Sequence, residues 1–279
     1  MNTYEMLQEL RANISETVAT HWGPKELLKK LSAHHRRVAA MLMLKQGDWL
    51  LKKSSALTPV AGVITLPADC AKPVYMEDVS SGAEIAIDTT VRERRWTRPL
   101  ASGLEPGMLN AYMMDGVIEI NDATVVSTVY LWYQRKVWDL IAGTADTAST
   151  TNAIVIAVAD GPRYTDDYYI GAMLEVVGGT GIGTAAAITD YVGSTRVLTV
   201  AGSFGTDTIY GTVPQVPEEG HDLIVLGATM QAMAKPSSDV EGEIFKYYAS
   251  LYTEAREVFN DWASTRKSGS THVRRTEVD

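Results

Sequence analysis

At 279 residues the chain can bury a sizeable core and hold two domains, so its size permits an enzyme without requiring one. Hydrophobic residues make up 46% and charged residues 21%, as in globular proteins. A net charge of −9 disfavours general attraction to DNA or anionic membranes. We expect no membrane association, since no apolar run approaches the roughly 20 residues that span a bilayer. Without a signal core, and with Cys70 as its single cysteine, the chain is expected to stay in a cytoplasm.

Two segments near the N-terminus have apolar residues at the spacing of amphipathic helices. The first helix is predicted from Thr3 to Thr17. Pro24 suits the first turn of a second helix, because its missing N–H would be unbonded there anyway. Gly47 can take the left-handed conformation that ends this helix. The apolar stripes consist of Met6, Leu7, Leu10, Ile14 and Val18 in the first helix, and of Leu27, Leu28, Leu31, Val38, Met41 and Leu42 in the second.

From Gly62 onward the apolar period changes to two, which predicts short antiparallel strands. Asp115 and Gly116 form a two-residue hairpin signal, since both residues tolerate positive φ. The predicted strands are 63–66, 73–76, 84–87, 110–113, 117–120 and 126–133.

A second β-rich block, residues 143 to 213, has a different composition. It contains no lysine and only two arginines, Arg163 and Arg196, whereas the second helix is basic. Such a shift marks a module boundary, so we predict a small inserted β-barrel or sandwich. Its clearest strands are 154–158, 173–177 and 196–200, and the helical cations are Lys25, Lys29, Lys30, Arg36, Arg37 and Lys45.

Helical periodicity returns after Pro217. A third helix is predicted from Glu218 to Ala234, and Ser238 with Glu241 forms a capping box that opens a fourth. The core stripe expected for the fourth helix is Ile244, Tyr248, Leu251, Ala255, Phe259 and Trp262. Residues 267 to 279 have no apolar stripe and are predicted to be a flexible tail.

The predicted fold class is therefore α+β. A helical bundle of about four helices from both chain ends is expected to combine with an antiparallel β module and an inserted β domain. The predicted divisions are a helical body of 1–60 with 214–266, a β module of 61–142, an inserted domain of 143–213 and a tail of 267–279.

Motifs for catalysis or cofactor binding are weak. The glycine-rich stretch 179–183 resembles part of a phosphate loop, but a strand follows it, so we interpret it as a hairpin turn. Adjacent imidazoles in 34–37 point in different directions, which favours a solvated face or subunit interface over a metal site. Asp160, Asp166 and Asp167 lack the ligand series of a calcium loop. We expect no enzyme and no cofactor, although catalytic carboxylates placed by the fold would leave a virion hydrolase as an alternative.

The order of several short motifs resembles the head-to-tail connector adaptors of tailed bacteriophages, the ring proteins beneath the portal. The resemblance covers residues 1–142 and 214–266 and leaves the inserted block unexplained. Cys70 departs from the family, since an aromatic residue is common there. The motifs are Asp48-Trp49, Ser54-Ser55, Leu66-Pro67-Ala68-Asp69 with Lys72, Tyr112, Gly116, Ile118 and Ile120, Leu131 to Lys136 with Leu140, Asp222 to Ala228, and Tyr247, Tyr248 and Tyr252.

The resemblance implies a dodecameric ring in the virion neck, assembled in the host cytoplasm. Its partners would be the portal protein, a tail or nozzle protein, and double-stranded DNA that crosses the lumen without sequence-specific binding. The expected subunit-interface residues are Lys29, Lys30, Arg36 and Arg37, and the expected portal-docking residues are Lys267, His272, Arg274 and Arg275.

A binding module is the main alternative function. In that reading the inserted β domain recognises a glycan or a capsid or host surface, and its aromatic side chains stack on sugar rings. The candidate aromatics are Tyr164, Tyr168, Tyr169, Tyr191, Phe204 and Tyr210.

Overall fold

A computed structural model describes residues 1–16, 21–45, 48–67, 69–88, 110–114, 116–120, 128–146, 152–234 and 242–265. The chain is α+β, with α-helices and largely antiparallel sheets. It divides into two compact units. The large unit comprises Met1–Gly47 with Val137–Asp279, and the small unit comprises Asp48–Lys136.

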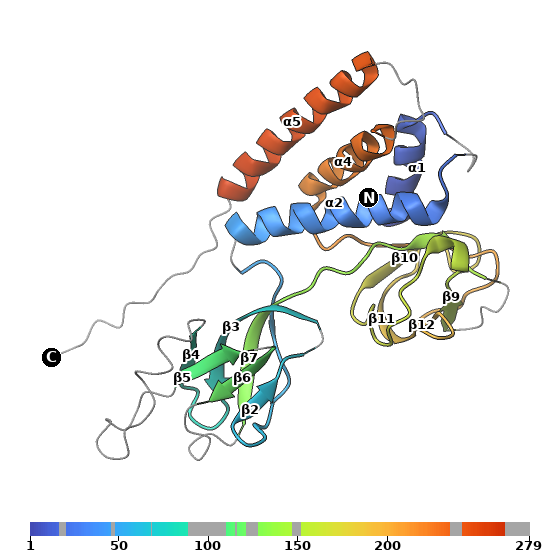
Figure 1. Cartoon of the computed structure of the whole chain (residues 1–279). Helices are drawn as coiled ribbons and strands as arrows, with labels where there is room; N and C mark the ends of the chain where they lie inside the picture. The colour runs from blue at the N-terminus through green and yellow to red at the C-terminus, as the bar shows by residue number, and fades with distance from the viewer. Residues whose placement is uncertain are drawn as a thin grey trace, which may run out of the picture. The chain divides into compact units, whose positions relative to one another are not determined.

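Helix α4 is the centre of the helical layer and contacts α1, α2 and α5. Most of its residues are apolar and buried, as expected for a helix that other elements cover on several sides. Figure 1 shows α2 running between α4 on one side and the six-stranded sheet of the same unit on the other. The α-helices of the described residues are α1 (Thr3–Asn13), α2 (Pro24–Lys45), α4 (His221–Met233) and α5 (Gly242–Thr265).

Helix α1 is shorter than predicted. Asn2 forms a capping box with Glu5 at its start, and the helix ends at Asn13 rather than at Thr17. Ser15 takes a positive φ of 55°, which is incompatible with a continuing right-handed helix. The apolar stripe therefore overestimated the helix length at its C-terminal end.

Helix α5 follows the predicted stripe in part: Phe259 is buried and Tyr248, Leu251, Ala255 and Trp262 are half-buried, whereas Ile244 is exposed and Ala263, outside the stripe, is buried. Phe259 and Ala263 are each 1% exposed, whereas Ile244 is 42% exposed. Trp262 is half-buried and stacks on Phe259 at a centroid distance of 5.8 Å. The predicted capping box of Ser238 and Glu241 lies outside the described residues.

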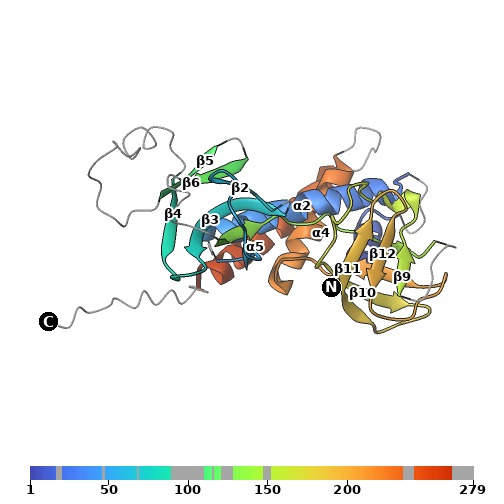
Figure 2. The ribbon, with the colours of Figure 1, turned by 90° about the horizontal axis from the view of Figure 1, so that it is seen from below.

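The sheet of the large unit has six strands in the order β8-β13-β10-β11-β12-β9, and every pair is antiparallel. Figure 2 shows this sheet from below. Its buried core contains Leu174, Val176, Leu198 and Tyr210. The strands are β8 (Ala142–Thr144), β9 (Ala153–Val155), β10 (Met173–Gly178), β11 (Ala185–Val192), β12 (Val197–Val200) and β13 (Ile209–Thr212); short 3-10 turns are η1 (Val158–Asp160) and η2 (Glu218–Gly220).

The small unit has a seven-stranded sheet in the order β1-β7-β3-β4-β5-β6-β2. The buried side chains of β7, including Val129, Leu131 and Tyr133, alternate along the strand, because neighbouring residues point to opposite faces. The strands are β1 (Leu51–Lys53), β2 (Val63–Thr65), β3 (Cys70–Asp78), β4 (Glu84–Asp88), β5 (Asn110–Met114), β6 (Val117–Ile120) and β7 (Val129–Arg135).

The expectation of a wholly antiparallel module was wrong at one position. Strands β4 and β5 pair in parallel, with Ala86 opposite Asn110. Parallel neighbours need a connection of about a dozen or more residues, and the intervening stretch 89–109 is long enough. The β5–β6 hairpin is confirmed by the pairing of Met114 with Val117 and by the φ of 81° at Gly116.

Candidate functional site: the basic face of α2

The two faces of α2 have opposite character. Its core face buries six apolar residues, Ala39 among them, which fixes the orientation of the helix. The remaining face presents the predicted interface residues: Lys29, Arg36 and Arg37 are exposed and Lys30 is half-buried. The buried apolar residues are Leu27, Leu28, Leu31, Val38, Ala39 and Leu42.

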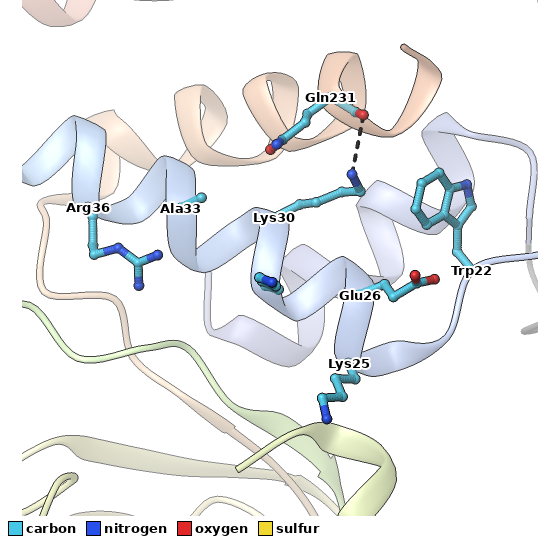
Figure 3. Close-up of a pocket in the computed structure, with 8 residues that line it drawn as sticks. Trp22, Lys25, Glu26, Lys30, Ala33, Arg36 and Gln231 are labelled. Carbon is cyan, nitrogen blue, oxygen red and sulfur yellow. Dashed lines mark hydrogen bonds between the residues drawn. The ribbon is translucent and has the colours of Figure 1, made fainter. Parts of the chain in front are cut away.

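An open groove of about 450 Å³ lies along this basic face. Four of its lining residues are cations and one is a carboxylate, so it is suited to anionic groups. Arg37 does not line the groove, although it was predicted together with the other three. Figure 3 shows the groove, whose lining residues are Trp22, Lys25, Glu26, Lys29, Lys30, Ala33, Arg36 and Gln231.

Trp22 and Lys30 form one end of the groove. The Lys30 Nζ atom lies 4.6 Å from the centroid of the Trp22 ring and donates to the backbone carbonyl of Gln231 at 3.3 Å. The Trp22 amide donates to Glu16 Oε1 at 2.9 Å, which fixes the loop before α2. Lys30 is therefore held over an aromatic ring, an arrangement that stabilises its charge.

Arg36, at the other end, shares a carboxylate with a residue of the β block. Arg36 forms an ion pair with Asp139, and Arg163 Nε lies 2.5 Å from Asp139 Oδ2. Asp139 is 15% exposed, whereas both arginines are about half exposed. Two guanidinium groups on one carboxylate leave a net positive charge at this point.

The histidines of the 34–37 segment are buried, so the expectation of a solvated face was wrong for them. His34 is 6% exposed and His35 is fully buried. Burial, reinforced by Arg37 and Lys30, lowers the pKa of His34 to about 4. His35 accepts a hydrogen bond from the Gln215 amide at its Nε2 atom, and burial lowers its pKa to about 3. Both rings are neutral near pH 7 and contribute no charge to the groove.

A second polar cluster lies in the small unit and joins residues far apart in the sequence. The Tyr133 hydroxyl donates to Asp69 Oδ1 at 2.7 Å, and Lys52 Nζ lies 2.7 Å from Asp69 Oδ2. Burial opposes ionisation of Asp69, yet the bonds from Lys52 and Tyr133 hold its pKa below the ordinary value. Burial and the bond to Asp69 raise the pKa of Tyr133. Nearby, the Leu131 amide donates to Ser54 Oγ at 2.9 Å.

The other sequence candidates have structural roles or lie outside the described residues. The 179–183 stretch connects β10 to β11, and Gly179, Gly181 and Gly183 all have positive φ, as a turn requires. Asp166 accepts a hydrogen bond from the Gly193 amide at 2.8 Å. The four predicted portal-docking residues, Lys267, His272, Arg274 and Arg275, lie outside the described residues.

Two searches over the described part of the chain were negative. There, no three His, Cys, Asp or Glu side chains come together in a way that could hold a metal ion. No helix in the described ranges combines the length and the apolar character needed to cross a bilayer.

Sequence reasoning found the cations of α2 but missed the residues that complete the groove. Trp22 and Gln231, which line the groove, and Asp139, which pairs with Arg36, come from three separate segments, and no periodicity in the sequence links them to α2. No protein-family model matches this chain, and no curated protein matches it at a significant level.

Proposed function

We propose that the chain is a structural head-to-tail adaptor of a tailed bacteriophage. It forms a dodecameric ring in the virion neck, binds the portal protein on one face and a tail or nozzle protein on the other, and lets double-stranded DNA pass through its lumen. In this proposal the chain has no enzymatic activity.

The meeting of the adaptor-like motifs in the small unit is the observation that carries the proposal. Asp69 ends the Leu-Pro-x-Asp motif, and Tyr133 belongs to the aromatic strand that closes the series, yet their side chains are hydrogen-bonded at 2.7 Å. Ser54, from the polar stretch, bonds the backbone of Leu131 on the same strand. These contacts bring three of the motifs together in one sheet, and we take this as support for the resemblance to the adaptors.

The arrangement of the helices gives further support. Helices α1 and α2 from the start of the chain contact α4 from its later part, as a single adaptor body requires. We propose that these helices, with α5, form the helical bundle of the ring protomer. Residues 143–213 are then an added β domain of barrel or sandwich type.

Charge also favours a conduit over a DNA-binding protein. The net charge of −9 opposes adhesion of the phosphate backbone, so DNA can slide through a ring of such protomers. The basic face of α2 is then available for contacts between protein subunits.

The glycan-binding alternative loses most of its aromatic platform. Tyr169, Tyr191 and Tyr210 are fully buried and Phe204 is 5% exposed, so none of these four rings can stack on a sugar. Of the six candidates, Tyr164 is exposed and Tyr168 packs partly against the core. No observation favours this alternative over the adaptor.

Electron microscopy of the protein mixed with the portal rings of the same virion tests the proposal. We expect a ring of density beneath the portal. Absence of any complex at micromolar protein, with both components folded, would contradict the adaptor function.

The proposed docking role of Lys267, His272, Arg274 and Arg275 has its own test. Truncation after Arg266 is expected to weaken co-sedimentation with portal rings and to leave thermal unfolding unchanged. A full-length control with the four residues changed to glutamine separates their side chains from tail length. Undiminished co-sedimentation of both variants would refute the docking role.

A further inference from the structure

Two surfaces of opposite charge occur on the large unit. One is the basic groove of α2, formed by Lys25, Lys29, Lys30 and Arg36. The other, here called the acidic face, contains the exposed residues Glu5, Glu9, Glu219 and Asp222 of α1, η2 and α4.

The acidic face has uncompensated negative charge. Burial and the neighbouring charge of Asp222 raise the pKa of Glu9, so two carboxylates repel each other there. Within the described residues, no ion pair involves Glu9, Glu219 or Asp222. A cationic partner would relieve this repulsion.

Two cations of the basic groove also lack ionic partners among the described residues. Lys25 and Lys29 lie one helical turn apart and, within the described ranges, take part in no ion pair. Ala33 continues the same line along α2, and its small side chain lets another chain approach closely between Lys29 and Arg36.

The two surfaces face different ways. In Figure 3 the labelled side chains of the groove lie along α2, and α1 is drawn behind α2. Helix α1 turns its buried residues Leu7 and Leu10 inward, which leaves Glu5 and Glu9 on its outer side. One copy therefore cannot satisfy its own groove with its own acidic face.

We propose that the basic groove of one copy binds the acidic face of a second copy of this chain, in a head-to-tail interface. Such an interface joins different surfaces of neighbouring protomers, and it closes into a ring when the rotation between copies permits. The inference rests on the proposed ring and names its paired surfaces. Because both surfaces are exposed, their attraction weakens as salt rises.

Reciprocal charge reversal tests this pairing. Lys25→Glu with Lys29→Glu reverses the groove, and Glu9→Lys with Glu219→Lys reverses the acidic face. Each variant alone places like charges together, so self-association is expected to weaken by roughly tenfold or more. An equimolar mixture restores opposite charges at every contact and is expected to regain wild-type association.

Sedimentation velocity at low and high salt measures these associations on the full chain. Lys72→Glu with Arg256→Glu is the matched control, since it makes the same charge change at exposed positions elsewhere. The single variant Lys29→Glu serves as a second groove variant in case the Lys25 stem, which packs against Gly161, is needed for folding.

Several outcomes would overturn the inference. These are a wild-type protein that stays monomeric at low salt, variants that associate like the control, and a mixture that fails to recover. Retention of duplex DNA through Lys29 without self-association would assign the groove to a nucleic acid instead. If one of these results is found and the protein still binds the portal, the interface proposal fails and the adaptor function stands. If the mixture regains association but the protein does not bind the portal, the adaptor function fails and the proposed interface stands.

Discussion

The two sheets of this protein differ in how they relate to the helices. The seven-stranded sheet forms a compact unit of its own, Asp48–Lys136, around a core that includes Met76, Leu131 and Tyr133. The six-stranded sheet shares the large unit with all the described helices, although its composition marks it as a separate module. A change in composition therefore does not by itself identify a structurally independent block.

Buried hydrogen bonds explain the attachment of the six-stranded sheet. Thr3 Oγ1 donates to the Thr212 carbonyl at 2.6 Å, and the Leu140 amide donates to Ser32 Oγ at 2.9 Å. Each bond is buried and joins a helix to the β block or its flank. Loss of one partner would leave a buried polar group unsatisfied, which costs about 1 to 3 kcal/mol.

Deleting each sheet in turn is expected to give the largest difference between the two sheets. Replacing Asp48–Lys136 with a flexible linker is expected to leave the helices folded, because the large unit keeps its contacts. The inserted domain predicted from the sequence implies that removal of 144–213 would also leave the helices folded. Because α1 contacts β8 and β13, we expect instead that the deletion of 144–213 no longer unfolds cooperatively.

Circular dichroism during urea titration separates the two excised proteins, with the full chain as the control. A 144–213 deletion that unfolds cooperatively with full helical signal would restore the independent insert. Loss of the helical signal in the 48–136 excision would show instead that the large unit depends on the small one.

Acidification is expected to destabilise the large unit before the small one. His34 and His35 have folded pKa values of about 4 and about 3, below the ordinary 6.5, so the unfolded chain binds their protons more readily. Stability present above pH 6.5 is lost as the pH falls toward 4, by about 3 kcal/mol for each of the two histidines. Burial raises the pKa of Asp160 to about 6, and its protonation offsets part of this loss.

The small unit loses its pH-dependent stability only at lower pH. Hydrogen bonds from Ser80 and Ser81 lower the pKa of Asp78 to about 2, so its contribution persists above pH 3.8 and is lost below it. Amide hydrogen exchange between pH 7 and pH 4 measures both units at once. If amides of the small unit lose protection from exchange at the same pH as those of the large unit, or at a higher pH, the expectation is contradicted. The variant His34→Gln is expected to reduce the acid-induced loss of protection in the large unit.

Glycine-to-alanine substitutions test the packing of α1 on the six-stranded sheet, with a smaller expected effect on stability. A Cβ at Gly211 would lie 2.6 Å from the backbone nitrogen of Tyr4, so Gly211→Ala is expected to cost about 1 to 3 kcal/mol. Gly116→Ala is the matched change in the small unit. It meets no atom within 4 Å, and its φ of 81° predicts a cost of about 1 kcal/mol. A smaller loss for Gly211→Ala than for Gly116→Ala in urea denaturation would show that α1 moves away from β13 at little cost.

Single hydroxyl deletions give the smallest expected effects. Thr3→Val removes the donor to Thr212 at the attachment and should cost about 1 to 2 kcal/mol. Tyr133→Phe leaves Asp69 bonded to Lys52 and should cost about 0.5 to 1.5 kcal/mol. Chemical denaturation with hydrogen exchange assigns each loss to a unit. A Thr3→Val variant as stable as wild type would show that this bond does not hold the sheet to α1.

Local chemistry accounts for the elements that the sequence predicted well. Pro24 opens α2, Gly116 provides the positive φ of a hairpin, and β7 alternates in burial as its pattern indicated. The strand predicted after the 179–183 turn is β11, although its alanines lack the β-branched and aromatic residues typical of strands. Strand β1 was missed because it has three residues, two of them lysines.

The sequence by itself determined which residues could face a core and where the cations of α2 lie, because those properties follow from periodicity along one element. Tertiary structure decided that His34 and His35 are buried, because α2 is covered both by other helices and by the β block. It also brought Asp139 to Arg36 and Tyr133 to Asp69. Such contacts join segments distant in the chain, and their positions depend on the packing of whole elements rather than on any local pattern.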